Sequence, residues 1–98
     1  MFTQGDKMVK FVEVFESNNN NYNMREVVIN PSHVIALRED DIAKRALNES
    51  RMPKGISPET SFTKVYLNSG NFNLMMTVAS PISIVEQKLA GTKKILKG

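Results

Sequence analysis

Apolar and polar residues alternate with a period close to two along most of the chain, the pattern of short β-strands. Five runs rich in Val, Ile, Leu and Phe predict strands at residues 8–16, 24–29, 34–39, 62–68 and 73–79. The first run carries apolar side chains on both faces, with Phe11 and Phe15 on one and Val12 and Val14 on the other. A strand of this kind is buried on both sides, as in a barrel. We therefore expect a mainly-β fold: a small, strongly bent five-stranded antiparallel barrel.

The alternation stops between the third and fourth predicted strands. Residues 39–61 are rich in charge and contain Pro53 and Pro58, which predicts a long, mobile insertion with a short helix at Asp41–Asn48. After the fifth strand, Ser80 and Pro81 are typical of a helix start. We expect one domain over residues 1–98, with a barrel at 8–79, a C-terminal helix at 81–90 and a basic tail at 91–98.

The composition excludes several classes of function. The chain has 98 residues, no cysteine and one histidine, which removes disulfides, thiolate zinc sites and multi-histidine metal sites within one chain. No apolar run approaches the ~20 residues of a membrane helix, and no phosphate-binding glycine loop or hydrolase elbow is present. We expect a non-enzymatic protein without cofactors, located in the cytoplasm (of the host cell, if the protein is viral) and with no membrane partner.

The net charge of +3 comes from the C-terminal end. Residues 1–80 hold nine basic and nine acidic side chains, whereas residues 81–98 hold Lys88, Lys93, Lys94 and Lys97 against Glu86. Two interpretations remain open. The lysines either form a solvated helix end, favoured by the helix dipole, or a patch that attracts phosphate.

The acidic triplet Glu39, Asp40 and Asp41 follows the third predicted strand. We interpret it as a solvated strand end, with a weak divalent-ion site as the alternative. It lacks the alternating ligands and the glycine of a calcium loop.

His33 lies in the turn between the second and third predicted strands. It either satisfies local backbone groups or offers a flat ring on which a nucleotide base stacks. Asn30 lies in the same turn, while Asn68, Gly70 and Asn71 lie in the turn between the fourth and fifth strands, where Gly70 is expected to adopt positive φ. Asparagine suits base edges and turns equally well, so the meaning of these residues depends on whether the two turns meet.

The segment Asn30-Pro31-Ser32-His33-Val34-Ile35-Ala36-Leu37-Arg38-Glu39 resembles the first motif of Sm-like RNA-binding proteins, and Val65-Tyr66-Leu67-Asn68-Ser69-Gly70-Asn71 resembles the second. Three positions differ from the family motifs. Asn30 replaces the acidic residue, Val34 replaces the asparagine that reads the base, and Asn68 replaces the arginine. The chain as a whole is similar to an ocean-metagenome family of Sm-like proteins attributed to cyanophages. The resemblance implies a homo-oligomeric ring in which the fourth strand of one subunit pairs with the fifth of the next. It also implies an RNA or single-stranded DNA site at the pore, formed by Asn30, His33, Asn68, Gly70 and Asn71.

The same segments, followed by a short helix, also resemble a small family of flagellar-operon regulators, although the 38–61 insertion argues against that match. The expected function is non-catalytic binding of RNA or single-stranded DNA by an Sm-like ring. The alternative is a protein-interaction or structural adaptor, or a regulator, of phage origin that binds no nucleic acid.

Overall fold

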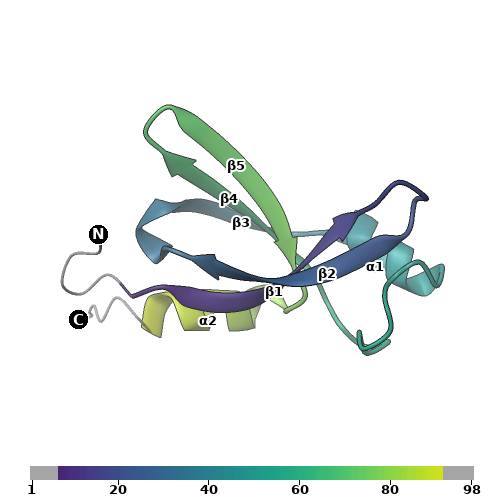
Figure 1. Ribbon diagram of the computed structural model, residues 1–98. Helices are drawn as coiled ribbons and strands as arrows, with labels where there is room; N and C mark the ends of the chain where they lie inside the picture. The colour runs from purple at the N-terminus through teal and green to yellow at the C-terminus, as the bar shows by residue number, and fades with distance from the viewer. Residues whose placement is uncertain (1–6, 92–98) are drawn as a thin grey trace.

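One antiparallel sheet dominates the computed structural model, which describes residues 7–91 (Figure 1). Its strands are β1 (Val9–Glu16), β2 (Tyr22–Ile29), β3 (Val34–Glu39), β4 (Thr63–Ser69) and β5 (Phe72–Val78), in the order β2-β1-β5-β4-β3. A 3₁₀ turn, η1 (Pro31–His33), joins β2 to β3, helix α1 (Asp41–Asn48) follows β3, and helix α2 (Ile82–Gly91) follows β5. No helix within the described residues has the length and apolar character needed to span a membrane.

The mainly-β fold, the antiparallel arrangement and the C-terminal helix are confirmed. The third strand and the short helix have the predicted bounds, and β2 begins two residues earlier than predicted, at Tyr22. Helix α2 begins at Ile82, because the carbonyl of Pro81 accepts the first helical hydrogen bond, from the amide of Val85 at 3.1 Å. Shifts of this size are usual, since the ends of an element depend on single hydrogen bonds.

The sheet is open, which differs from the expected closed barrel. β2 and β3 are consecutive in the chain, yet they form the two edges of the sheet and do not pair. β1 and β5 join the halves through two register pairs only, Glu13 with Val78 and Val14 with Thr77. Beyond them the β4–β5 hairpin rises away from β1 and β2 (Figure 1). Val14 belongs to a second core, whereas Val9 and Phe11 belong to the main core, so β1 contributes to two cores.

The strand pairing within the chain also bears on the implied ring contact. β4 pairs with β3 from Thr63 to Leu67 and with β5 along its whole length. Both of its edges are therefore occupied, and a pairing of the fourth strand with the fifth strand of a neighbour does not fit this structure. Among residues 7–91 the outer edges of β2 and β3 pair with no further strand, although the amide of Tyr22 at the start of β2 donates to Arg51.

The main core lies between the bent sheet and α2. Its buried members come from β1, β2, β4, β5 and α2: Val9, Phe11, Ile29, Val65, Val78, Val85 and Leu89. Val85 and Leu89 are four residues apart, so they share the helix face that covers the sheet. Burying an aliphatic side chain of this size contributes ~1.5–3 kcal/mol, so the predicted apolar stripe of α2 is a main source of stability.

A second core lies under α1 and the connection that follows it. Val14, Ala43 and Phe62 are its buried residues, and Tyr22, Leu47, Met52, Ile56 and Ala79 pack around them. The amide of Tyr22 also donates to the carbonyl of Arg51 at 2.8 Å. The segment 39–61 is thus attached to the β1–β2 hairpin. Its mobility stays a prediction, and these contacts argue against it.

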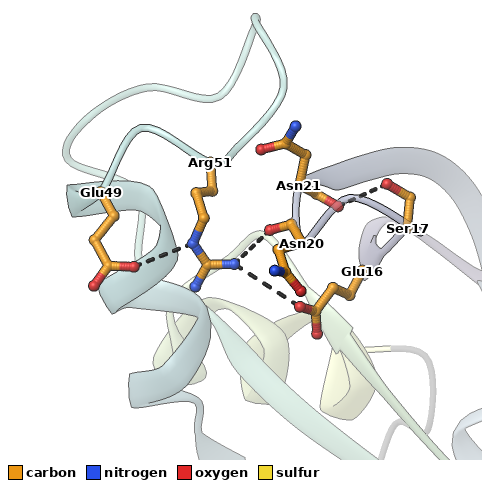
Figure 2. A network of polar contacts seen from close by, with 6 residues as sticks. All are labelled: Glu16, Ser17, Asn20, Asn21, Glu49 and Arg51. Atoms are coloured by element: carbon orange, nitrogen blue, oxygen red, sulfur yellow. Dashed lines mark hydrogen bonds and ion pairs between the residues drawn. The ribbon is translucent and has the colours of Figure 1, made fainter.

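Arg51 is the centre of that attachment (Figure 2). Its guanidinium donates to Glu49 at 3.1 Å and to the carbonyl of Asn20 in the β1–β2 turn, and it lies 3.9 Å from a carboxylate oxygen of Glu16. It also lies over the ring of Tyr22, 5.7 Å from the centroid. One cation therefore links the end of α1 to the turn between β1 and β2.

Candidate functional site

The two turns singled out in the sequence lie next to each other. His33 ends η1, and its Nδ1 lies 3.1 Å from the backbone oxygen of Asn68, at the far end of β4. The residues are 35 positions apart in the chain, so only the folded sheet brings them together. The condition on which the sequence-based site depended, that the two turns converge, is thus met within one chain.

The β2–β3 turn is built around Asn30. Its side-chain Oδ1 accepts from the amide of Ser32 at 2.9 Å, and its backbone oxygen accepts from the amide of His33 at 3.0 Å. Pro31 is buried and supplies the φ that the first residue of a short helical turn needs. Asn30 therefore shapes the turn that presents His33.

The β4–β5 turn has the expected geometry. Gly70 has φ +67°, and Ser69 pairs with Phe72 across a two-residue loop. A glycine at the first of two loop positions is preferred in tight hairpins. Nδ2 of Asn68 donates to Oδ1 of Asn73 on the facing strand, and Asn71 is exposed at the tip.

The contact with Asn68 determines the proton position on His33. A backbone carbonyl only accepts, so Nδ1 carries the hydrogen, and in the neutral ring Nε2 is then an acceptor. This bond is also what a turn histidine that satisfies a backbone group would make. The geometry is therefore compatible with both interpretations of His33, and it fixes the position of the ring in either case.

Beside His33 lies an apolar hollow of about 270 Å³, which we call the hairpin groove. It runs between the end of β2 and the inner side of the β4–β5 hairpin, and its lining includes Ile29, Asn30, His33, Phe72, Leu74 and Met76. Phe72 is 60% exposed although it is aromatic. The groove is open because the hairpin extends past the main core.

Phe72 and Leu74 are site residues that the sequence analysis missed. The fifth strand was predicted to start at Asn73 and the turn to end at Asn71, which left Phe72 outside both. The alternation Phe72, Leu74, Met76, Val78 places all four on one face and was the available signal. Asn73 was also missed, and its partnership with Asn68 depends on the register of the hairpin.

The acidic triplet is not uniformly solvated, which corrects the sequence interpretation. Glu39 and Asp41 are exposed, but Asp40 is only 8% exposed. Its Oδ1 accepts from the amide of Ala43 at 3.0 Å, so it caps α1, and its Oδ2 accepts from the hydroxyl of Thr77 at 2.6 Å. Among residues 7–91 no group of three metal-ligating side chains is present.

Other charged groups have structural contacts. Hydrogen bonding to Glu13 raises the pKa of Arg25, whose guanidinium also lies over the ring of Phe15. Partial burial, with Glu16 and Asp40 nearby, raises the pKa of Tyr22. In the basic C-terminal region, Lys88 lies 5.3 Å from the ring centroid of Phe11, while Lys93, Lys94 and Lys97 lie outside the described residues.

Comparison with known proteins found no matching family model, no matching curated protein and no matching solved structure. The protein is therefore classified by its fold alone, an open, five-stranded antiparallel sheet with a C-terminal helix. The resemblances to Sm-like proteins and to flagellar-operon regulators stay predictions.

Proposed function

We propose that this protein is a non-catalytic RNA- or single-stranded DNA-binding module that acts as a homo-oligomer. The observation that supports this most directly is the meeting of His33 with Asn68, because it joins the two turns that carry all five predicted site residues. The hairpin groove beside them adds an exposed aromatic ring, Phe72. Proteins bind single-stranded bases by stacking them on flat rings and by forming hydrogen bonds from amide groups to the base edges.

In the proposed mechanism, a base enters the hairpin groove and stacks on His33 or Phe72. Asn30 and Asn71 present amide groups at the rim, and Gly70 allows the backbone of the turn to come close to the nucleotide. One such site contributes ~1–3 kcal/mol per base, which is weak alone. Several copies acting on one strand raise the overall affinity through their high effective concentration.

The proposed assembly uses the open edges of β2 and β3, since β4 has no free edge. An edge strand exposes unpaired backbone donors and acceptors, which a neighbouring copy can satisfy. Pairing of the β2 edge of one copy with the β3 edge of the next would continue the sheet from copy to copy, and it would place the site of each copy in a repeated arrangement.

Titration of labelled oligo(U) and oligo(A), followed by fluorescence anisotropy, tests the proposal. We expect binding that weakens as salt rises, and we expect His33→Ala to lower the affinity about tenfold, the equivalent of one stacked base. His33→Phe is the matched variant: it keeps a flat ring but not Nδ1, so stacking predicts that it binds. Equal affinity of the wild type and His33→Ala would leave His33 as a turn residue only.

The second candidate is a protein-interaction or structural adaptor. It is favoured by the exposed apolar side chains outside the hairpin groove, among them Val12, Met24 and Ile42. The ratio of absorbance at 260 and 280 nm in protein purified from cells discriminates the two. Co-purified nucleic acid supports the first proposal, and a clean protein that captures one partner supports the second.

A further inference from the structure

The outer face of β3, β4 and β5 carries an unusual pair of cations. Arg38 and Lys64 are register partners on neighbouring strands, and both side chains point away from the main core. Like charges placed directly opposite each other destabilise a sheet. Among the described residues neither side chain has a carboxylate within the 4.0 Å of an ion pair. The two positive charges therefore lie side by side without a direct ion pair.

The carboxylates nearest to Lys64 have other hydrogen-bond or ion-pair partners, so none of them forms a direct ion pair with Arg38 or Lys64. Lys64 borders a hollow that also contains Glu13, Glu16 and Asp40. Glu13 holds Arg25 at 2.9 Å, Glu16 lies 3.9 Å from Arg51, and both oxygens of Asp40 accept hydrogen bonds. Glu39 is adjacent to Arg38 in the chain but lies on the opposite face of the sheet.

Next to the cations on the same face are groups on which a base can rest. Tyr66 lies two residues after Lys64, and its register partner on β5 is Met75, which is 58% exposed. A β-bulge at Ile35 leaves that side chain 66% exposed beside them. These residues line an open hollow of about 420 Å³ whose wall consists of Ile35, Tyr66, Leu67, Asn73, Leu74 and Met75.

Two asparagine side chains continue this row of outer-face residues towards the β4–β5 turn. Asn68 and Asn73 are register partners on the outer face, and one hydrogen bond joins Nδ2 of the first to Oδ1 of the second. The other two amide atoms, Oδ1 of Asn68 and Nδ2 of Asn73, form an acceptor next to a donor. The backbone oxygen of Asn68 also contacts His33, so this row ends at the site proposed above.

We infer that this outer strip, formed by Arg38, Lys64, Tyr66, Met75, Asn68 and Asn73, is a second contact surface for the same single-stranded nucleic acid. The cations hold a backbone phosphate, Tyr66 and Met75 support a base, and the amides meet a base edge. The charge complementarity of a phosphate with two neighbouring cations that have no direct ion pair is the main argument for this occupant. The inference rests on the proposed function and extends it from the hairpin groove to the outer face.

The test measures how the affinity for labelled oligo(U) depends on salt, using the full chain. Replacing both cations, Arg38→Gln with Lys64→Gln, should reduce the magnitude of the slope of log affinity against log salt by ~0.7, because one phosphate contact on a single strand contributes ~0.7. Arg45→Gln with Lys54→Gln is the matched control: both residues are exposed, neither has an ion pair among the described residues, and the net charge changes equally. The control should leave the slope within ~0.3 of the wild type.

The stacking part is tested by Tyr66→Leu against Tyr66→Phe. The first should lower affinity about tenfold and the second should retain it, because only the ring is needed. The cation variant removes a like-charge contact, so its melting temperature should not fall, and lost binding would not be due to unfolding.

The outcomes separate the two proposals. If the wild type binds and His33→Ala weakens it, but neither the outer-strip double variant nor Tyr66→Leu differs from its control, the outer strip is refuted and the proposed function stands. If the outer-strip variants lose binding and His33→Ala does not, the outer strip is supported and the groove assignment is wrong. Absence of binding by the wild type overturns both.

Discussion

At the scale of single residues, backbone conformation decides how the two site turns are shaped. Gly70 needs positive φ, Asn30 caps its own turn, and His33 satisfies the carbonyl of Asn68. These are local requirements, so they limit which substitutions at the site are informative. A change at Asn30 would alter the position of His33 as well as remove an amide.

Gly70→Ala should lower the free energy of unfolding by ~1–2 kcal/mol. A Cβ at this position meets no atom within 4 Å, so the cost comes only from the left-handed backbone, which L-residues disfavour. Thermal unfolding should show a midpoint lower by roughly 4–8 °C for each kcal/mol.

Gly91→Ala is the matched control for that substitution. Gly91 is the last residue of α2, its φ is not in the left-handed region, and a Cβ there also meets nothing within 4 Å. It should be neutral or slightly stabilising, because alanine favours helices. A loss of stability equal to that of Gly70→Ala would contradict the conformational explanation.

At the scale of elements, Asp40 connects a helix to the sheet. One carboxylate oxygen caps α1 and the other accepts from Thr77 on β5, so α1 is fixed at the point where β1 and β5 separate. Arg51 fixes the other end of the same segment to the β1–β2 turn (Figure 2). Two polar anchors thus hold the second core closed around Phe62.

Asp40→Ala should lower the free energy of unfolding by ~2–3 kcal/mol. Loss of the cap costs ~1 kcal/mol, and the half-buried hydroxyl of Thr77 loses its acceptor at a further ~1–2 kcal/mol. Denaturant titration measures the effect. Asp41→Ala, at the exposed neighbour, should change stability by no more than ~0.5 kcal/mol, and equal losses at both positions would show that Asp40 acts only through its charge.

At the scale of the whole molecule, the proposed association of copies depends on the outer edges of β2 and β3, which no other strand covers within residues 7–91. β2 exposes Met24 and Val28 on its outer side, and β3 exposes Ile35. The hairpin groove and the outer strip lie on the two faces of the β4–β5 hairpin, so a bound strand would pass around its tip. Met24 lies outside both surfaces, whereas Val28 also lines the hairpin groove.

Light scattering should find particles that are multiples of the 11.0 kDa chain. Val28→Glu should shift the mass towards one chain, because charge on an edge strand opposes pairing with another copy. Within the chain the new carboxylate faces Lys10, the register partner of Val28, so the fold should persist.

Val28→Thr is the conservative control, because it keeps a β-branched side chain on the edge and should keep the assembly. A wild-type mass of 11.0 kDa would remove the oligomer from the proposed function. The test of the outer strip would remain, since that surface lies within one chain.

Much of the fold was predictable because it depends on neighbours in sequence. Alternation located all five strands, the serine and proline before Ile82 located α2, and the turn pattern anticipated the positive φ of Gly70. The site was predictable only as two separate turns. Phe72 and the outer strip were not, because their exposure depends on how far the hairpin extends past the core and on which face of each strand is covered.

The sequence by itself determined which segments form strands, helices and tight turns, because these follow from residue spacing and local capping. Only the tertiary structure decided that β2 and β3 do not pair, that Asp40 is buried, and that His33 meets Asn68. Those features depend on contacts between residues far apart in the chain. A periodic pattern specifies which face of an element is apolar, but not which partner that face will find.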